Sequence, residues 1–177
     1  MITFEESGMT FGPFSEEKCF IIEKSPTYKK MEGVKIAEFI LLRSSSENRE
    51  LVWIVEAKSS SPKVENRTKF PEFIDEINQK LANTLLLLVS ICLQRHKLDN
   101  NELPDSFKNI DLATIDFRLI LVINGHKKEW LEPLQREIQK TLQPMRKIWN
   151  LSGNSVIVLN DELAHKHQLI SNLSPTL

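Results

Sequence analysis

Glu56 and Lys58 are the residues of this chain whose types and spacing most clearly indicate chemistry. They close the run Leu51-Val52-Trp53-Ile54-Val55-Glu56-Ala57-Lys58, in which five apolar residues precede the first charge. Such a run is typical of a buried β-strand, and residues two apart on a strand point to the same side. Because burying an unpaired charge costs free energy, a carboxylate and an ammonium at this position predict a polar group or ligand between them.

Glu38 is a third charged residue that the chain should bring to the same place. It belongs to residues 35–43, a mostly apolar run that precedes the first one and is separated from it by a polar loop. The two runs are expected to form a hairpin. If Leu42 pairs with Leu51, Glu38 lies opposite Val55, one position from Glu56. A slip of one residue would change this pairing, but Glu38, Glu56 and Lys58 would still cluster on adjacent strands.

Two carboxylates beside an ammonium suit a divalent cation. Mg²⁺ prefers oxygen ligands and keeps several of its waters, so that Glu38 and Glu56 would suffice to hold Mg²⁺ or Mn²⁺. A bound metal lowers the pKa of a bound water and neutralises the charge of a phosphodiester. Lys58 could then hold the attacking water or stabilise the transition state. An enzyme that acts on nucleotides or other small phosphates could use a metal ion held by the same residues in the same way.

An acidic residue on one strand, a hairpin and Glu-x-Lys on the next strand resemble the PD-(D/E)XK, restriction-endonuclease-like nucleases. Ala37-Glu38-Phe39-Ile40 stands for the first acidic motif and Glu56-Ala57-Lys58 for the second. The resemblance covers about the first 125 residues when the order of elements is included. It implies a restriction-endonuclease-like core and a Mg²⁺-dependent or Mn²⁺-dependent nuclease for DNA or RNA. Glu38, Glu56 and Lys58 would be catalytic, with Glu38 and Glu56 as the metal ligands.

The chain departs from the family pattern in several places. The first acid is usually Asp, whereas here it is Glu38 preceded by Ala37, and no opening helix is evident. Some members carry a Gln on the helix after the Lys, and Gln79 would take that accessory position. Many also carry a further acid on the first helix, for which the sequence offers Glu5, Glu6, Glu16 and Glu17.

The remaining sequence predicts the elements that would position these residues. We expect strands at residues 19–22, 35–43, 51–59, 116–123 and 155–159, and helices at 71–94, 129–148 and 161–170. The second helix contains Pro144, where it could break. The three early strands are close enough in sequence to form a meander, and the later ones alternate with helices. The sequence thus predicts an α/β fold, a single domain over residues 1–177 with a mixed central sheet flanked by helices.

The overall charge of the chain does not indicate a nucleic-acid partner, whereas the resemblance to nucleases does. The formal net charge is -1, so no global basic field favours nucleic acid. A local site is still expected at Lys63, Arg67 and Lys69, which follow the Lys58 strand and would face phosphates. The alternative is a catalytically degenerate module on the same fold that serves as a protein-interaction or nucleic-acid-binding subunit. A homodimer or a protein partner would then supply recognition.

Compartment and membrane association are predicted from absences. Cys19 and Cys92 follow no metal spacing and lie in apolar runs, as reduced core thiols do. The first residues, Met1-Ile2-Thr3-Phe4-Glu5-Glu6, lack a basic start and an apolar core. The run Leu85 to Val89, which no apolar run of the chain exceeds in length, is too short to cross a bilayer. A cytoplasmic protein without membrane segments is therefore expected.

Overall fold

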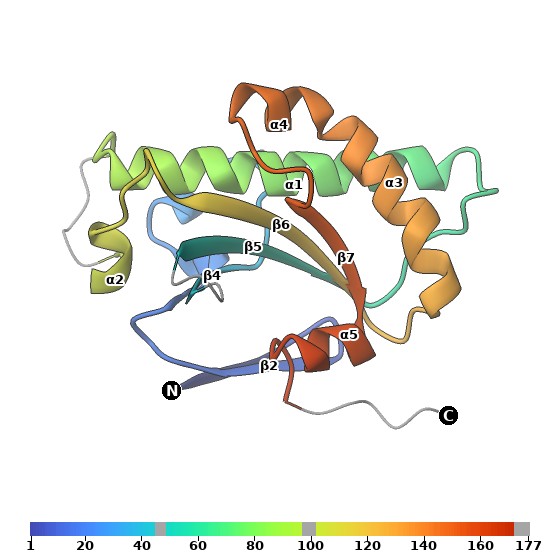
Figure 1. Cartoon of the computed structure of the whole chain (residues 1–177), viewed down its shortest axis with the longest axis horizontal. Helices are drawn as coiled ribbons and strands as arrows, with labels where there is room; N and C mark the ends of the chain where they lie inside the picture. Colours follow the sequence, from blue (N-terminus) through green and yellow to red (C-terminus); the bar gives the residue numbers. More distant parts are fainter. Residues whose placement is uncertain (45–48, 97–101, 172–177) are drawn as a thin grey trace.

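A five-stranded mixed sheet forms the centre of the fold (Figure 1). The computed structural model describes residues 1–44, 49–96 and 102–171. The strand order is β3-β4-β5-β6-β7. These strands are β3 (Cys19–Phe20), β4 (Phe39–Ser44), β5 (Glu50–Lys58), β6 (Asp116–Ile123) and β7 (Val156–Asn160). Neighbours are antiparallel from β3 to β5 and parallel from β5 to β7, so that β5, β6 and β7 end at the same edge.

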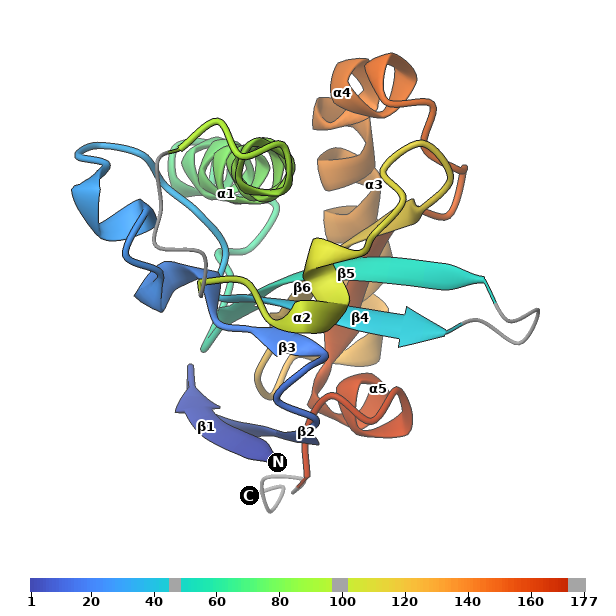
Figure 2. The ribbon, with the colours of Figure 1, turned by 90° about the vertical axis from the view of Figure 1, so that its left-hand side faces the viewer.

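Helices cover one face of the sheet. Figure 2 shows α1 (Lys69–Cys92), α3 (Leu131–Thr141) and α4 (Gln143–Ile148) on that side. Apolar residues of α1, such as Ile77 and Leu81, share a fully buried core with Ile54 of β5. The short helices α2 (Asp105–Lys108), η1 (Ile22–Lys24), η2 (Tyr28–Lys30) and η3 (Lys128–Trp130) connect the larger elements.

The other face is covered by an N-terminal hairpin and α5 (Asp161–Lys166). The hairpin consists of β1 (Ile2–Glu6) and β2 (Met9–Phe14). Its phenylalanines pack on Phe39 of β4, with ring centroids 5.0 Å away for Phe4 and 5.1 Å away for Phe11. Aromatic burial of this kind holds the hairpin on the sheet.

The tip of the hairpin reaches the edge where β5 and β6 end. Ser7 and Gly8 both have positive φ angles, as a two-residue type I′ turn requires. The Ser7 hydroxyl donates to the carbonyl oxygen of Ala57 at 3.1 Å, and the side-chain amide of Asn124 donates to the carbonyls of Ser7 and Gly8 at 3.2 Å each. These contacts fix the position of Glu6, the last residue of β1.

Replacing Gly8 by alanine is expected to destabilise the protein more than replacing Gly33. Both glycines have φ near +75°, but an added Cβ at Gly8 would lie 2.8 Å from the Asn124 amide nitrogen, whereas at Gly33 it would meet nothing. Gly33→Ala should therefore cost about 1 kcal/mol for backbone conformation, and Gly8→Ala about 1 kcal/mol more for the disturbed hydrogen bonds. Urea unfolding of the two variants measures both losses. Equal losses would mean that the Asn124 contact does not hold the turn.

The structure confirms an α/β fold with a mixed sheet and flanking helices, but several expected bounds are wrong. The second strand begins at Phe39 instead of residue 35. The helix expected at 129–148 begins as the short helix η3 and is divided into α3 and α4, so the possible break near Pro144 is confirmed. The break falls at Leu142, just before Pro144, which has no N–H to continue the helix. The hairpin β1–β2 was not predicted. No helix in the described ranges is long and apolar enough to cross a membrane.

Candidate active site

Glu38 and Glu56 face each other on neighbouring chain segments. Phe39 pairs with Val55 and Leu42 with Val52, so the expected pairing of Leu42 with Leu51 is wrong by one residue. Continuing the observed register by one position puts Glu38 opposite Glu56. The Glu38 backbone N–H donates to the Val55 carbonyl at 3.1 Å, which fixes Glu38 immediately before β4.

Both carboxylates lie on the side of the sheet that faces α1. Alternation along β5 puts Glu56 on the same side as Ile54, and alternation into β4 puts Glu38 on the same side as Ile40. Ile40 and Ile54 belong to the core beneath α1. Glu56 is 0% exposed and Glu38 is 8% exposed, and carboxylates are rarely buried to this degree unless they are paired.

The two oxygens of Glu56 have different surroundings. Oε1 accepts a hydrogen bond from Lys80 Nζ at 2.7 Å and lies 3.3 Å from Lys58 Nζ. Within the described ranges, the buried Oε2 has no hydrogen-bond partner. A buried carboxylate oxygen without a donor loses its hydration without compensation. Oε2 is therefore the atom of this cluster with an unused capacity to bind a ligand.

Helix α1 adds Glu76 and Lys80, two residues that sequence reasoning missed. They are four apart and so lie on one face of the helix. Lys80 Nζ is 3.4 Å from Glu38 Oε1, and Lys58 Nζ donates to Glu76 Oε1 at 2.6 Å. Charges of alternating sign thus run from Glu38 through Lys80, Glu56 and Lys58 to Glu76.

Burial dominates the protonation of the two central carboxyls. It raises the pKa of Glu56 to about 7 against the opposing attraction of Lys80. Burial also raises the pKa of Glu38 to about 7, and a hydrogen bond with Glu23 adds to the rise. Burial alone would lower the pKa of Lys80, but Glu56 and Glu38 raise it above its ordinary value.

The hydrogen bond from Lys58 lowers the pKa of Glu76 below its ordinary value. Glu76 is therefore ionised at neutral pH and holds the Lys58 ammonium at the rim of the site. The Lys58 side chain is 24% exposed, so it is only partly covered by the protein.

Metal-free protein is expected to become more stable as the pH falls from about 7 toward 4.5. The folded-state pKa of Glu56, about 7, exceeds its ordinary value of 4.5. In this window the folded state binds more protons than the unfolded state, so the free energy of unfolding falls as the pH rises. The shift corresponds to at most about 3 kcal/mol for this one group.

Urea unfolding in EDTA at several pH values checks this dependence. The change in the free energy of unfolding per pH unit should be smaller in Glu56→Gln than in the parent, because the glutamine amide does not titrate. Glu72→Gln is the matched control, since Glu72 is an exposed glutamate in the first turn of α1. A Glu56→Gln slope equal to that of the parent would show that Glu56 titrates at its ordinary pKa.

Two further acids approach Glu38 from outside the sheet. One oxygen each of Glu6, Glu23 and Glu38 lie within 4.8 Å of one another. Glu23 belongs to η1, which sequence reasoning also missed. Glu6 is the N-terminal acid that the hairpin brings to the site.

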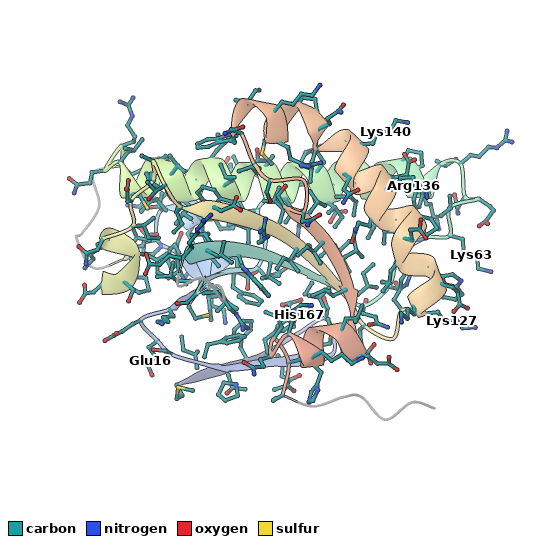
Figure 3. The ribbon with its side chains drawn as sticks, in the orientation of Figure 1. Glu16, Lys63, Lys127, Arg136, Lys140 and His167 are labelled. Atoms are coloured by element: carbon teal, nitrogen blue, oxygen red, sulfur yellow. The ribbon has the colours of Figure 1, made fainter. Side chains whose placement is uncertain are left out.

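The other N-terminal candidates lie elsewhere. Glu5 accepts from the Thr10 hydroxyl, and Glu16 accepts from the amino group of Met1 at 3.1 Å. Figure 3 shows Glu16 at the periphery beside the hairpin. Glu17 is exposed. Glu6 is thus the residue of this group that joins the site geometrically.

The predicted accessory and nucleic-acid-binding residues are not part of the charge network just described. The Gln79 side chain donates to the carboxylate of Asp75, one turn earlier on α1, and not to Glu38 or Glu56. Lys63, Arg67 and Lys69 are exposed in the segment between β5 and the first turn of α1. Their roles as accessory and phosphate-binding groups stay predictions.

Comparison of the chain with protein-family models, curated proteins and solved structures finds no match. The function must therefore be argued from the site itself.

Proposed function

We propose that this protein is a metal-dependent phosphodiesterase, a nuclease of the PD-(D/E)XK type that acts on DNA or RNA. One observation carries the proposal: Glu56 is fully buried opposite Glu38, one of its oxygens has no donor among the residues that the structure describes, and Lys58 follows it on the same strand. A fold rarely buries a carboxylate in this way without a use for it, and strongly perturbed pKa values cluster at functional sites.

The donor set fits Mg²⁺ or Mn²⁺. Glu38 and Glu56 would hold the ion, since carboxylate oxygens are the ligands that these cations prefer. Glu6 and Glu23 lie near enough to Glu38 to add ligands directly or through water. When bound, the ion lowers the pKa of a water molecule and offsets the charge of the phosphodiester.

The side chains of the site have separable tasks in this proposal. Lys58 donates a hydrogen bond to the attacking water or to a non-bridging phosphate oxygen from the rim. Glu76 orients Lys58 through their 2.6 Å contact, while the same ammonium stays 3.3 Å from Glu56 Oε1. Lys63, Arg67 and Lys69 attract the neighbouring phosphates of the strand.

A second candidate function is supported by Lys80. Its ammonium contacts both Glu56, at 2.7 Å, and Glu38, at 3.4 Å, and so supplies the positive charge that a metal would otherwise bring. A degenerate nuclease fold that acts as a protein-interaction or nucleic-acid-binding subunit would keep such a permanent internal cation. In the nuclease, the Lys80 ammonium must instead move away from Glu56 and Glu38 when the metal binds.

A cleavage assay tests the proposal. Purified protein is incubated with supercoiled plasmid, circular single-stranded DNA and a labelled RNA, in millimolar Mg²⁺ or Mn²⁺ and in EDTA. The proposal predicts cleavage of at least one substrate with metal and of none in EDTA. Intact substrates under all conditions, from protein that is folded, would favour the non-catalytic module.

A further inference from the structure

A pocket of about 450 Å³ is lined by residues that follow β5 and β6 along the chain. This volume falls within the range of pockets that bind small molecules. Its walls are mainly apolar and come from the β5–α1 segment, from α1, from the segment between β6 and α3 that includes η3, and from the first turn of α3. The lining side chains used below are Lys63, Val64, Phe70, His126, Trp130 and Leu134.

Trp130 offers an aromatic surface at the mouth of this pocket. It is 45% exposed, and Val64 nearby is 48% exposed. Exposed large apolar groups gathered at a hollow are typical of a binding site rather than of an ordinary surface. The Lys127 ammonium lies 5.2 Å from the Trp130 ring centroid, and the His126 ring meets it edge-on at 5.3 Å.

Two lysines, one lining the pocket and one lying over the Trp130 ring, place positive charge there, beside the single pocket-lining carboxylate of Glu65. Figure 3 shows Lys63 and Lys127 at the same end of the molecule, near the start of α3. Lys63 lines the pocket and is exposed. An apolar, aromatic interior with cations at the rim is complementary to a nucleotide, whose base is flat and apolar on its faces and whose phosphate is anionic.

The pocket and the carboxylate site share one edge of the sheet. Lys58 pairs with Ile123. The pocket residue Ser61 follows Lys58 by three positions, and His126 follows Ile123 by three. Three residues span at most about 11 Å, so that one nucleic-acid strand can reach both places.

We propose that this pocket binds an unpaired nucleobase of the strand whose phosphodiester enters the carboxylate site. The base stacks on Trp130, and Lys63 and Lys127 bind the flanking phosphates. A base inside an intact duplex is stacked and paired, and extruding it costs free energy. The substrate is therefore single-stranded nucleic acid or a single-stranded end. This inference rests on the proposed function for its choice of ligand.

Fluorescence anisotropy with a labelled oligothymidine tests the pocket in EDTA, where no metal-dependent cleavage occurs. The single strand is expected to bind more tightly than a blunt hairpin duplex of equal length. Trp130→Ala should weaken binding of the single strand about tenfold, because base stacking on an aromatic side chain is lost. Trp130→Phe should keep most of the affinity. Leu93→Ala, an exposed apolar residue just after α1, is the control and should bind like the parent.

Intrinsic fluorescence gives a second readout that does not need the alanine variant to fold. Oligothymidine should quench the parent protein, and the quenching should largely disappear in Trp130→Phe, since Trp53 and Trp149 are not among the pocket residues. Equal affinity for single strand and duplex, or binding and quenching that do not depend on Trp130, would overturn the inference.

The two proposals fail separately. Trp130-dependent binding of the single strand without any cleavage supports the pocket and contradicts the nuclease. If the protein cleaves in the presence of metal but Trp130→Ala does not change its affinity for the single strand, the nuclease is supported and the base-binding pocket is contradicted.

Discussion

Glu56→Gln is expected to lower metal-dependent cleavage at least about a hundredfold while the protein stays folded. Glutamine keeps the shape of the side chain, but its neutral amide has one oxygen and cannot offset the charge of a divalent cation. Losing one precisely placed electrostatic contact in an active site typically costs two to three orders of magnitude in rate, or about 3–4 kcal/mol. The measurement is the initial rate of cleavage in Mg²⁺ and in Mn²⁺.

Lys58→Met should lower the rate of metal-dependent cleavage by a similar factor, but for a different reason. Methionine preserves the aliphatic stem and removes the ammonium that would contact the water or the phosphate. Because Lys58 is not a metal ligand in this account, Lys58→Met should still bind Mn²⁺, whereas Glu56→Gln should not. Glu72→Gln on the exposed side of α1 is the matched control and should cleave at the parental rate. Retained cleavage in either site variant would remove that residue from the mechanism.

Lys80→Met is expected to destabilise metal-free protein by about 3 kcal/mol at pH 8 and to strengthen Mn²⁺ binding about tenfold. Removing one partner of a buried ion pair leaves an uncompensated charge, and here two carboxylates lose the same ammonium. A divalent cation can replace that charge, so the metal no longer has to displace Lys80. Urea unfolding with and without Mn²⁺ measures both effects.

The matched control is Lys69→Met, which removes an exposed ammonium from the first turn of α1 and should change neither quantity appreciably. The metal should restore most of the stability that Lys80→Met loses. If Mn²⁺ gives no stabilisation to Lys80→Met, the carboxylates do not bind metal, and Lys80 is a structural counter-ion of a non-catalytic module.

The order of the main elements could be predicted because each rests on a strong local pattern. The run from Leu51 to Val55 and the run in residues 116–123 are apolar on both faces, as strands covered on both sides require. Both form central strands of the sheet. The helical spacing of Ile77, Leu81 and Leu85 likewise predicted α1, and all three are fully buried.

The hairpin β1–β2 was missed although a signal was present. Ile2 and Phe4 alternate with polar residues before Ser7-Gly8, and Phe11 follows on the returning strand. Such alternation around a Gly-containing pair predicts a two-residue turn. Without this hairpin, Glu6 could not be separated from the other N-terminal acids.

The complete charge network could not be predicted, because it depends on packing between distant elements. Glu76 and Lys80 border the apolar stripe of α1, where charged residues are ordinarily solvated. Only the approach of α1 to β5 brings Lys80 to Glu56 and Glu76 to Lys58. The hairpin register was also underdetermined, since a one-residue shift cannot be fixed from the loop sequence alone.

Calorimetric titration of metal-free protein with Mn²⁺ asks whether Glu38 and Glu56 form a metal centre. We expect saturable binding with a dissociation constant of about 1 mM or lower, lost in Glu38→Ala and in Glu56→Gln and retained in Glu16→Gln, whose carboxylate pairs with the N-terminal amine. Absence of binding by the parent protein, or binding that survives both site substitutions, would contradict a metal centre at Glu38 and Glu56.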